Sequence, residues 1–256
     1  PELTDTGDSN NTTLNPTGTG GVVAGDSIRI VTWNVEGLSA TSTDEYAATR
    51  DILARLDADI VGLNEIDEFQ LDELQALASD LGYPTVVVPQ TNPFGELRNA
   101  MMARVRVTAA QVLTSAQLSG DPSANDMTRV PVAVTVDGWD LSVVCQHWKA
   151  GFDDADEFRR TVESVRGAQA GSYLNATHQI LMGDVNAEVT DGAEFPNPFT
   201  SLPVGLPSSF DLGDDLADEL DTGAGIANAP FQVMAAAGLE VIEASQVDGR
   251  LETRDV

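Results

Sequence analysis

The chain has 256 residues, a formal net charge of −28 from 41 acidic and 13 basic side chains, and 42% hydrophobic residues. This hydrophobic content suits a folded domain, and no apolar run approaches the roughly 18 residues of a membrane helix, which excludes a spanning protein. The acidic balance excludes the basic stripe of a protein that coats nucleic acid. The single cysteine, Cys145, excludes an intrachain disulfide and a cysteine-based zinc site, and its apolar surroundings predict a buried thiol.

The acidity has two interpretations. Lys149 is the only lysine in the chain, which favours a surface adapted to high salt, where ions screen the repulsion between like charges. Acidic drift in a secreted protein explains the same composition. In both cases any phosphate chemistry must be local, with a cation between the protein and its substrate.

Residues 1–26 are rich in Gly, Thr, Asn, Pro and Asp and contain little to bury, which predicts a flexible tether before a domain over residues 27–256. Such tethers are common in secreted proteins held to a membrane or cell wall. We therefore expect an extracellular or periplasmic protein, tethered to the cell surface through this segment. Because the chain begins with Pro1, we also expect it to be a processed or excised piece.

Hydrophobic patterning predicts alternating strands and helices in the first part of the domain. The expected elements are a strand over 28–33, a helix from the capping residue Thr43 to Leu56, a strand over 59–63, a helix over 71–81 that stops at Gly82, and a strand over 85–88. A strand, helix and strand within about 35 residues form a βαβ unit, which indicates an α/β fold with parallel strands.

The pattern becomes richer in strands from Ala100. Two strands over 130–136 and 139–147 flank Asp137-Gly138, a strong hairpin signal. The later elements expected are a helix over 156–174, a strand over 179–182, a long loop over 187–229 and a helix over 230–237 that ends at Gly238.

Polar clusters follow the apolar strands at their carboxyl ends, where α/β sheets bind ligands. They are Trp33 to Gly37, Asn64-Glu65, His147 to Lys149 and Gly183 to Asn186. Four clusters arriving at one edge indicate a single site, and their chemistry suggests metal-assisted cleavage of a phosphoester. Each residue alone has a plainer interpretation: a solvated carboxylate, a turn at Gly183 to Asn186, or a hydrogen-bonded core histidine.

The residues of these clusters have distinct expected roles. Carboxylates are hard ligands for Mg²⁺ or Mn²⁺, with Ca²⁺ as a further candidate, and amides can orient them or bind a ligand oxygen. A carboxylate can also deprotonate an attacking water, and a protonated histidine can stabilise phosphoryl charge. We assign Glu65 and Glu36 to the metal, Asn34 and Asn186 to the amides, Asp184 to the water and His147 to the phosphoryl oxygens. Lys149 is either a phosphate-binding residue or a solvated surface charge.

The ordered set of motifs resembles the endonuclease/exonuclease/phosphatase superfamily, which has the deoxyribonuclease-I-like fold. The motifs are WNVEGL at 33–38, VGLNEID at 61–67, NAMMAR at 99–104, VVCQHWKAG at 143–151 and GDVNAE at 183–188. The resemblance implies a four-layer α/β sandwich, with two mixed β-sheets face to face and helices outside, and divalent-metal-dependent hydrolysis of phosphoesters.

The resemblance also implies residue roles. Asn34 and Glu65 would lie at the metal and phosphate, with Glu36 in the place of an acidic residue found in some members. Asn99 would lie near the phosphate, and His147 would contact the scissile phosphate. Asp184 and Asn186 would position the attacking water.

One departure concerns the end of the family pattern, which closes with an Asp-His pair. His147 and His178 are the only histidines of the chain, and neither can be that residue. We therefore expect a fragment without its last strands, which hydrolyses phosphoesters poorly.

The function expected first is that of an extracellular endonuclease or phosphodiesterase, acting as a monomer on a phosphoester such as DNA or RNA. A phosphatase or phospholipase-type hydrolase of small or lipid phosphoesters is the second hypothesis. A non-catalytic binding domain or inactive fragment of the same fold is the third. Substrate choice resides in loops such as 187–229, so the sequence does not select among them.

Overall fold

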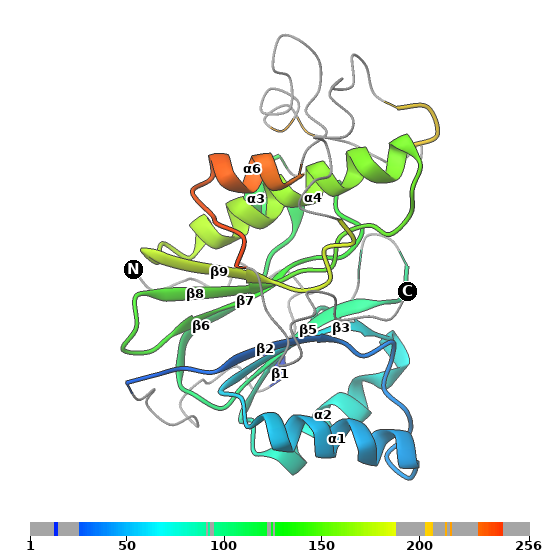
Figure 1. Ribbon diagram of the computed structural model, residues 1–256, viewed down its shortest axis with the longest axis vertical. Helices are drawn as coiled ribbons and strands as arrows, with labels where there is room; N and C mark the ends of the chain where they lie inside the picture. The colour runs from blue at the N-terminus through cyan, green and yellow to red at the C-terminus, as the bar shows by residue number, and fades with distance from the viewer. Residues whose placement is uncertain are drawn as a thin grey trace.

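Two mixed β-sheets lie face to face between two layers of helices, as Figure 1 shows. The computed structural model describes residues 13–14, 26–90, 92, 95–121, 124, 126–187, 203–206, 213, 216 and 230–242. Within this part of the chain the four-layer α/β sandwich expected from the sequence is confirmed. No helix of the described residues has the length and apolar character needed to cross a bilayer.

The first sheet has the order β1-β4-β5-β3-β2. Its strands are β1 (Thr13–Leu14), β2 (Ile30–Asn34), β3 (Ile60–Ile66), β4 (Thr85–Val87) and β5 (Arg98–Ala103). β2 and β3 are parallel, and the other pairs are antiparallel. The second sheet has the order β6-β7-β8-β9, with β8 and β9 parallel. Its strands are β6 (Val107–Val112), β7 (Val132–Val136), β8 (Leu141–Cys145) and β9 (His178–Met182).

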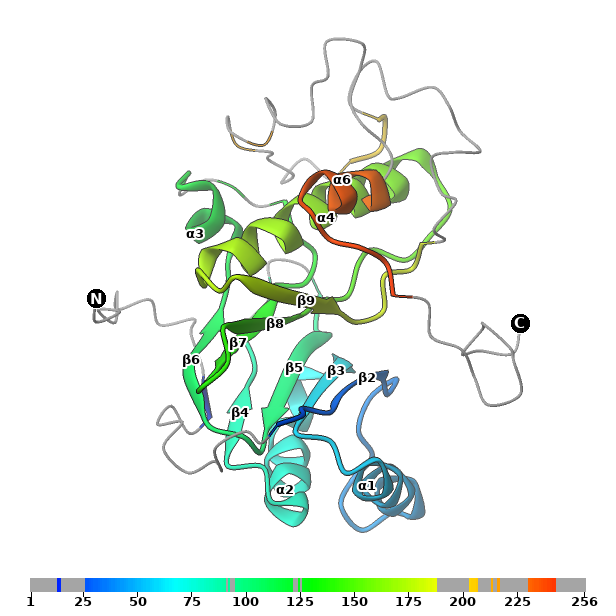
Figure 2. The same cartoon turned by 60° about the vertical axis from the view of Figure 1, so that its left-hand side comes forward.

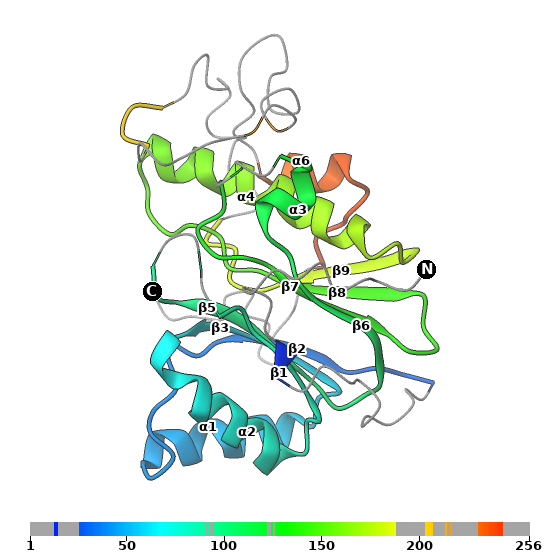
Figure 3. The ribbon, with the colours of Figure 1, turned by 180° about the vertical axis from the view of Figure 1, so that it is seen from behind.

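The helices divide between the two outer faces. α1 (Asp44–Leu56) and α2 (Leu71–Leu81) cover the first sheet, whereas α3 (Ser115–Ser119), α4 (Asp154–Tyr173) and α6 (Pro230–Ala236) lie over the second (Figure 3). A short 3-10 helix, η1 (Glu68–Gln70), precedes α2. α6 lies alongside α4, as seen in Figure 2.

The predicted βαβ unit is present as β2–α1–β3, and its helix boundaries follow from local chemistry. The Thr43 side chain accepts a hydrogen bond from the Tyr46 amide at 3.2 Å and caps α1. Asp57 ends α1 in the left-handed region with a φ of 46°. Gly82 ends α2 in the same region with a φ of 73°, which glycine adopts without a steric penalty.

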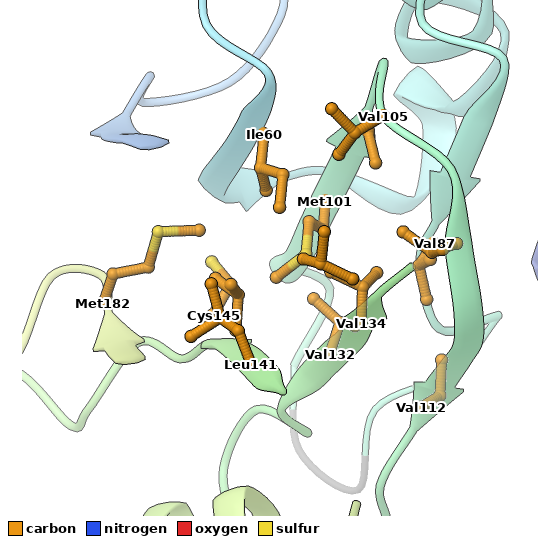
Figure 4. Close-up of a cluster of buried hydrophobic side chains, with 14 of the residues drawn as sticks. Ile60, Val87, Met101, Val105, Val112, Val132, Val134, Leu141, Cys145 and Met182 are labelled. Atoms are coloured by element: carbon orange, nitrogen blue, oxygen red, sulfur yellow. The ribbon is translucent and has the colours of Figure 1, made fainter. Parts of the chain in front are cut away.

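The central core fills the space between the two sheets. Figure 4 shows Ile60 and Met101 of the first sheet facing Val132, Cys145 and Met182 of the second. Cys145 is a fully buried free thiol, as the sequence predicted, and burial raises its pKa to about 12. This thiol is therefore a packing residue and not a nucleophile.

Two strands differ from the sequence-based expectation. β3 continues through Asn64 and Glu65 to Ile66, so these two residues lie inside the strand and not after it. Thr13 and Leu14 of the predicted tether pair with β4 as β1. The other residues of 1–25 and most of the predicted loop over 187–229 lie outside the described residues, so those domain boundaries stay predictions.

Candidate active site

The ends of strands from both sheets meet at one edge of the sandwich. Asn34 is the last residue of β2, and His147 follows β8 by two positions. Asp184 follows β9, and Glu65 lies near the end of β3. β2 is parallel to β3 and β8 is parallel to β9, so the carboxyl ends of the two strands of each pair lie at the same end of their sheet, together with the polar residues there. The structure therefore brings residues of the predicted clusters together at this edge, and their roles stay predictions.

A β-bulge in β3 turns the Glu65 side chain toward His147 of the second sheet. The pairing of β3 with β5 shifts register between Leu63 and Ile66, and Glu65 has a φ of 64°. In a regular strand the neighbours Asn64 and Glu65 would point to opposite faces of the sheet. The left-handed backbone at Glu65 instead lets the side chains of both Asn64 and Glu65 interact with residues of the second sheet. This backbone conformation is strained, and such strain is concentrated at functional sites.

Two carboxylates from opposite sheets share one amide. Asn34 Nδ2 donates to Glu65 Oε1 and to Asp184 Oδ2, at 2.9 Å in each case. The two oxygens therefore lie within about two hydrogen-bond lengths of each other. The side chains of Glu65 and Asp184 are 25% and 33% exposed, so a ligand can reach them from solvent. The arrangement concentrates negative charge around a single amide group.

His147 faces the two carboxylates from the second sheet. Its Nε2 lies 3.8 Å from Glu65 Oε1 and 3.9 Å from Asp184 Oδ2. Asn186 Nδ2 donates to Trp148 O at 3.1 Å, and this bond fixes which end of the Asn186 amide is the nitrogen. The same nitrogen lies 2.9 Å from His147 Nε2, so His147 Nε2 accepts its second hydrogen bond. Burial, reinforced by the charge of Arg129, lowers the pKa of the imidazole to about 4, so the ring is neutral at pH 7.

The sequence analysis missed Arg129, a half-buried arginine that precedes β7. Its Nη1 donates to Trp148 O at 3.4 Å. Burial lowers its pKa, whereas the negative charges of Glu163, Glu65 and Asp184 raise it, so the guanidinium lies in the field of the site carboxylates. The predicted hairpin could have indicated Arg129. β7 and β8 are antiparallel, so the start of β7 lies beside the end of β8, and a residue before β7 lies near His147, which follows β8.

Three other predicted site residues are placed differently. Asn99 is fully buried, and its amide bonds to Asn64 and to Val130 O, so it supports the site from below. The Lys149 ammonium forms an ion pair with Asp156 of α4 at 2.9 Å. Glu36 is exposed, and its backbone N–H donates to Asn34 Oδ1 at 3.0 Å. The described contacts therefore bring Asn34, Glu65, His147, Asp184 and Asn186 together, whereas the Lys149 ammonium and the Asn99 amide bond to other partners.

The donor set fits a hard divalent cation. Two carboxylates are held side by side next to a neutral histidine, and a bound cation would offset their repulsion. Within the described residues no group of three or more His, Cys, Asp or Glu side chains is placed to hold a metal ion. The Glu65 and Asp184 carboxylates would therefore be the protein ligands of such a cation, with water and substrate oxygens as the others.

A family model and several solved structures are similar to the chain. The model of the Endonuclease/Exonuclease/phosphatase family matches residues 31–207. Similar solved structures include humanized D. rerio TDP2 with 14 mutations (TM-score 0.46, 21% identity, 70% of this chain and 68% of that one). The beta hairpin deletion mutant of Staphylococcus aureus beta toxin (0.44, 15%, 64% and 68%) and ANGEL2, a 2',3'-cyclic phosphatase (0.48, 13%, 88% and 69%), are others. No curated protein sequence matches the chain.

The matched segment contains the whole cluster described above. It runs from the second residue of β2 past the end of β9, so it includes Asn34, Glu65, His147, Asp184 and Asn186. Members of the matched family are phosphoester hydrolases. The resemblance found in the sequence motifs is thereby confirmed: the chain belongs to the Endonuclease/Exonuclease/phosphatase family.

Proposed function

We propose that the chain is a divalent-metal-dependent phosphodiesterase, with Mg²⁺ or Mn²⁺ bound beside Glu65 and Asp184. The observation that carries the proposal is that carboxylates from opposite sheets accept hydrogen bonds from the same Asn34 amide.

The chemistry divides between the two carboxylates. The ion, when bound, would polarise the phosphoryl group as a Lewis acid. Glu65 would hold the ion from the first sheet. Asp184 orients the attacking water and accepts its proton, with its backbone fixed by a hydrogen bond to Asn64 at 2.9 Å. Asn34 keeps both carboxylate oxygens in place through its bidentate donation.

Positive charge and hydrogen-bond donors for the phosphate come from the second sheet. The Arg129 guanidinium lies in the electrostatic field of Glu65 and Asp184. It would form charge-assisted hydrogen bonds to a phosphate bound beside these carboxylates. Asn186 fixes the ring of His147 through the bond between its Nδ2 and His147 Nε2. Since burial disfavours the imidazolium, His147 acts as a hydrogen-bonding group in the resting protein, and phosphate binding beside it would favour its protonation.

The substrate class and cellular location belong to the proposal as well. A diester of nucleic acid is the first candidate, and a small or lipid phosphoester is the second. The net charge of −28 repels a polyanion at low salt, so nucleic acid should be cleaved faster as salt rises to moderate levels. The Gly- and Thr-rich composition of residues 1–26 supports a location outside the cell, with this segment as the tether.

A panel of phosphoesters tests the proposed activity. The protein is assayed with Mg²⁺ or Mn²⁺ on bis-p-nitrophenyl phosphate, p-nitrophenyl phosphate, plasmid DNA and phosphatidylcholine vesicles, and each assay is repeated with EDTA. We expect metal-dependent turnover of the diester, lowered about 10²–10⁴-fold by Asp184→Asn, which removes a general base. Asp72→Asn, an exposed position on α2, is the matched control.

The panel also separates the alternatives. Faster turnover of the monoester or of the vesicles would replace the phosphodiesterase assignment with the second candidate. The absence of turnover on every substrate, together with the absence of Mn²⁺ binding in calorimetry, would support a non-catalytic domain and overturn the proposal.

A further inference from the structure

Asn64 contacts four separate parts of the site. Its Oδ1 accepts from the backbone N–H of Asp184 at 2.9 Å, and its Nδ2 donates to Asn99 Oδ1 at 2.8 Å. The same Nδ2 lies 3.4 Å from Gln146 O, immediately before His147. Its backbone carbonyl accepts from Val35 N at 3.3 Å, at the exit of β2.

These contacts join the two sheets directly beneath the carboxylates. Asn64 is fully buried and belongs to β3, whereas Asp184 and Gln146 follow β9 and β8 of the other sheet. An apolar cluster fills the space between the sheets beside this network. A hydrophobic interface allows small sliding motions that a directional hydrogen bond opposes.

The hydrogen-bond network continues from Asn64 toward Arg129. Asn99 Nδ2 donates to Val130 O at 2.9 Å, and Val130 directly follows Arg129. The path therefore links Glu65, through its neighbour Asn64, to Asp184 on one side and to the Arg129 segment on the other.

We propose that Asn64 is a positioning residue that fixes the separation between Glu65 and Asp184 by tying the Asp184 backbone to β3. This inference rests on the proposed function, because it assigns Asn64 a role in the reaction of those two carboxylates. Asn64 lies beneath them, fully buried, and acts through Asp184.

The bond from the Asp184 amide is the critical one. Glu65 is held by its own strand and by Asn34, so its position survives the loss of the Asn64 side chain. Asp184 lies in a loop after β9, where Gly183 has a φ of 138°, and its N–H has Asn64 as its partner. A displacement of about 1 Å at a reacting group can lower the rate by about 10²-fold.

A double-mutant cycle tests the role. Asn64→Leu replaces the amide by an apolar group of similar size. We expect its kcat on the diester to fall about 10–100-fold with KM changed less than about threefold, because water positioning and not substrate binding is impaired. In the Asp184→Asn background the same change should lower kcat less than about threefold, because Asn64 acts through Asp184.

The control is Ser142→Ala, which removes a buried hydrogen bond remote from the carboxylates, from Ser142 Oγ of β8 to Gly171 O of α4. Its effect should be small and should multiply with that of Asp184→Asn. If the effect of Asn64→Leu also multiplies with that of Asp184→Asn, or raises KM as much as it lowers kcat, Asn64 is only a folding residue and the inference is wrong.

A second measurement does not depend on activity. Hydrogen exchange of the Asp184 amide, followed by NMR, should accelerate in Asn64→Leu and stay protected in Ser142→Ala. If Asn64→Leu does not fold, Asn64→Ala removes the same accepting oxygen without placing an apolar group against polar atoms, and the Asp184 amide should again exchange faster. An inactive wild type overturns the proposed function alone, and unchanged Asp184 exchange in Asn64→Leu overturns the positioning role alone.

Discussion

Asn34 Nδ2 and Asp184 Oδ2 lie 2.9 Å apart although 150 positions separate the two residues in the chain. The bond crosses from the first sheet to the second, and the same nitrogen donates to Glu65. It makes the site a property of the sheet interface: neither sheet alone contains both carboxylates. Substitutions that alter the contact between the sheets should therefore affect metal binding and catalysis together.

Metal affinity should depend on Glu65. Glu65→Gln keeps the shape of the side chain and removes its charge, so Mn²⁺ binding should weaken at least about tenfold, the lower end of the loss caused by removing a supporting residue at a metal site. Isothermal titration calorimetry measures the change. The control is Glu45→Gln on the exposed surface of α1, which changes the net charge of the protein by the same amount. Equal Mn²⁺ affinity in the two variants would show that Glu65 is not a metal ligand.

Arg129 should contribute to phosphate binding. Arg129→Gln removes the positive charge in the field of Glu65 and Asp184, and the loss of one charged hydrogen bond should lower kcat/KM about 10–100-fold. Steady-state kinetics on bis-p-nitrophenyl phosphate provide the measurement. Arg106→Gln, a half-exposed position that pairs with Asp137, is the control, and a similar loss in both variants would show a general charge effect.

Gly183 should tolerate no side chain. A Cβ added there would lie 1.7 Å from Gln146 O, and the φ of 138° is itself unfavourable for other residues. Gly183→Ala should therefore destabilise the fold by well over the ~1–2 kcal/mol that a left-handed conformation costs an ordinary residue. Gly82→Ala meets no atom within 4 Å and should cost only that strain, as urea unfolding of both variants would show.

Stability should rise with ionic strength. At a charge of −28 the carboxylates repel one another, and added ions screen that repulsion. Each kcal/mol of relieved repulsion should raise Tm by about 2–4 °C in a domain of this size. Thermal unfolding is followed from low salt to molar KCl, with sucrose as the uncharged control. A flat Tm across the KCl series would contradict adaptation to salt.

Local pattern was sufficient for most of the secondary structure. Thr43 and Gly82 mark helix ends through side-chain capping and a positive φ, which are properties of a few neighbouring residues. The Asp137-Gly138 turn between β7 and β8 is local in the same sense. The extension of β3 to Ile66 could not be predicted, because the bulge at Glu65 depends on pairing with β5.

The placement of site residues divides along the same line. Glu65, His147, Asp184 and Asn186 follow apolar runs in the sequence, and the topology of the sandwich brings such positions to one edge. Lys149 has the same sequence context, yet the first turn of α4 presents Asp156 to its ammonium. Asn99 is the second residue of β5, where partners in the neighbouring strand and across the sheet interface decide what it contacts.

The sequence by itself determined the family, the α/β class and the chain positions where polar residues leave apolar strands, because these depend on composition, periodicity and motif order. Only the tertiary structure decided that Asn34 joins Glu65 to Asp184, that Asn64 supports them and that Arg129 faces them. The physical reason is that these contacts cross between two sheets packed through an apolar core. Hydrophobic patterning specifies that the sheets pack, whereas hydrogen bonds between distant residues specify which polar atoms then meet.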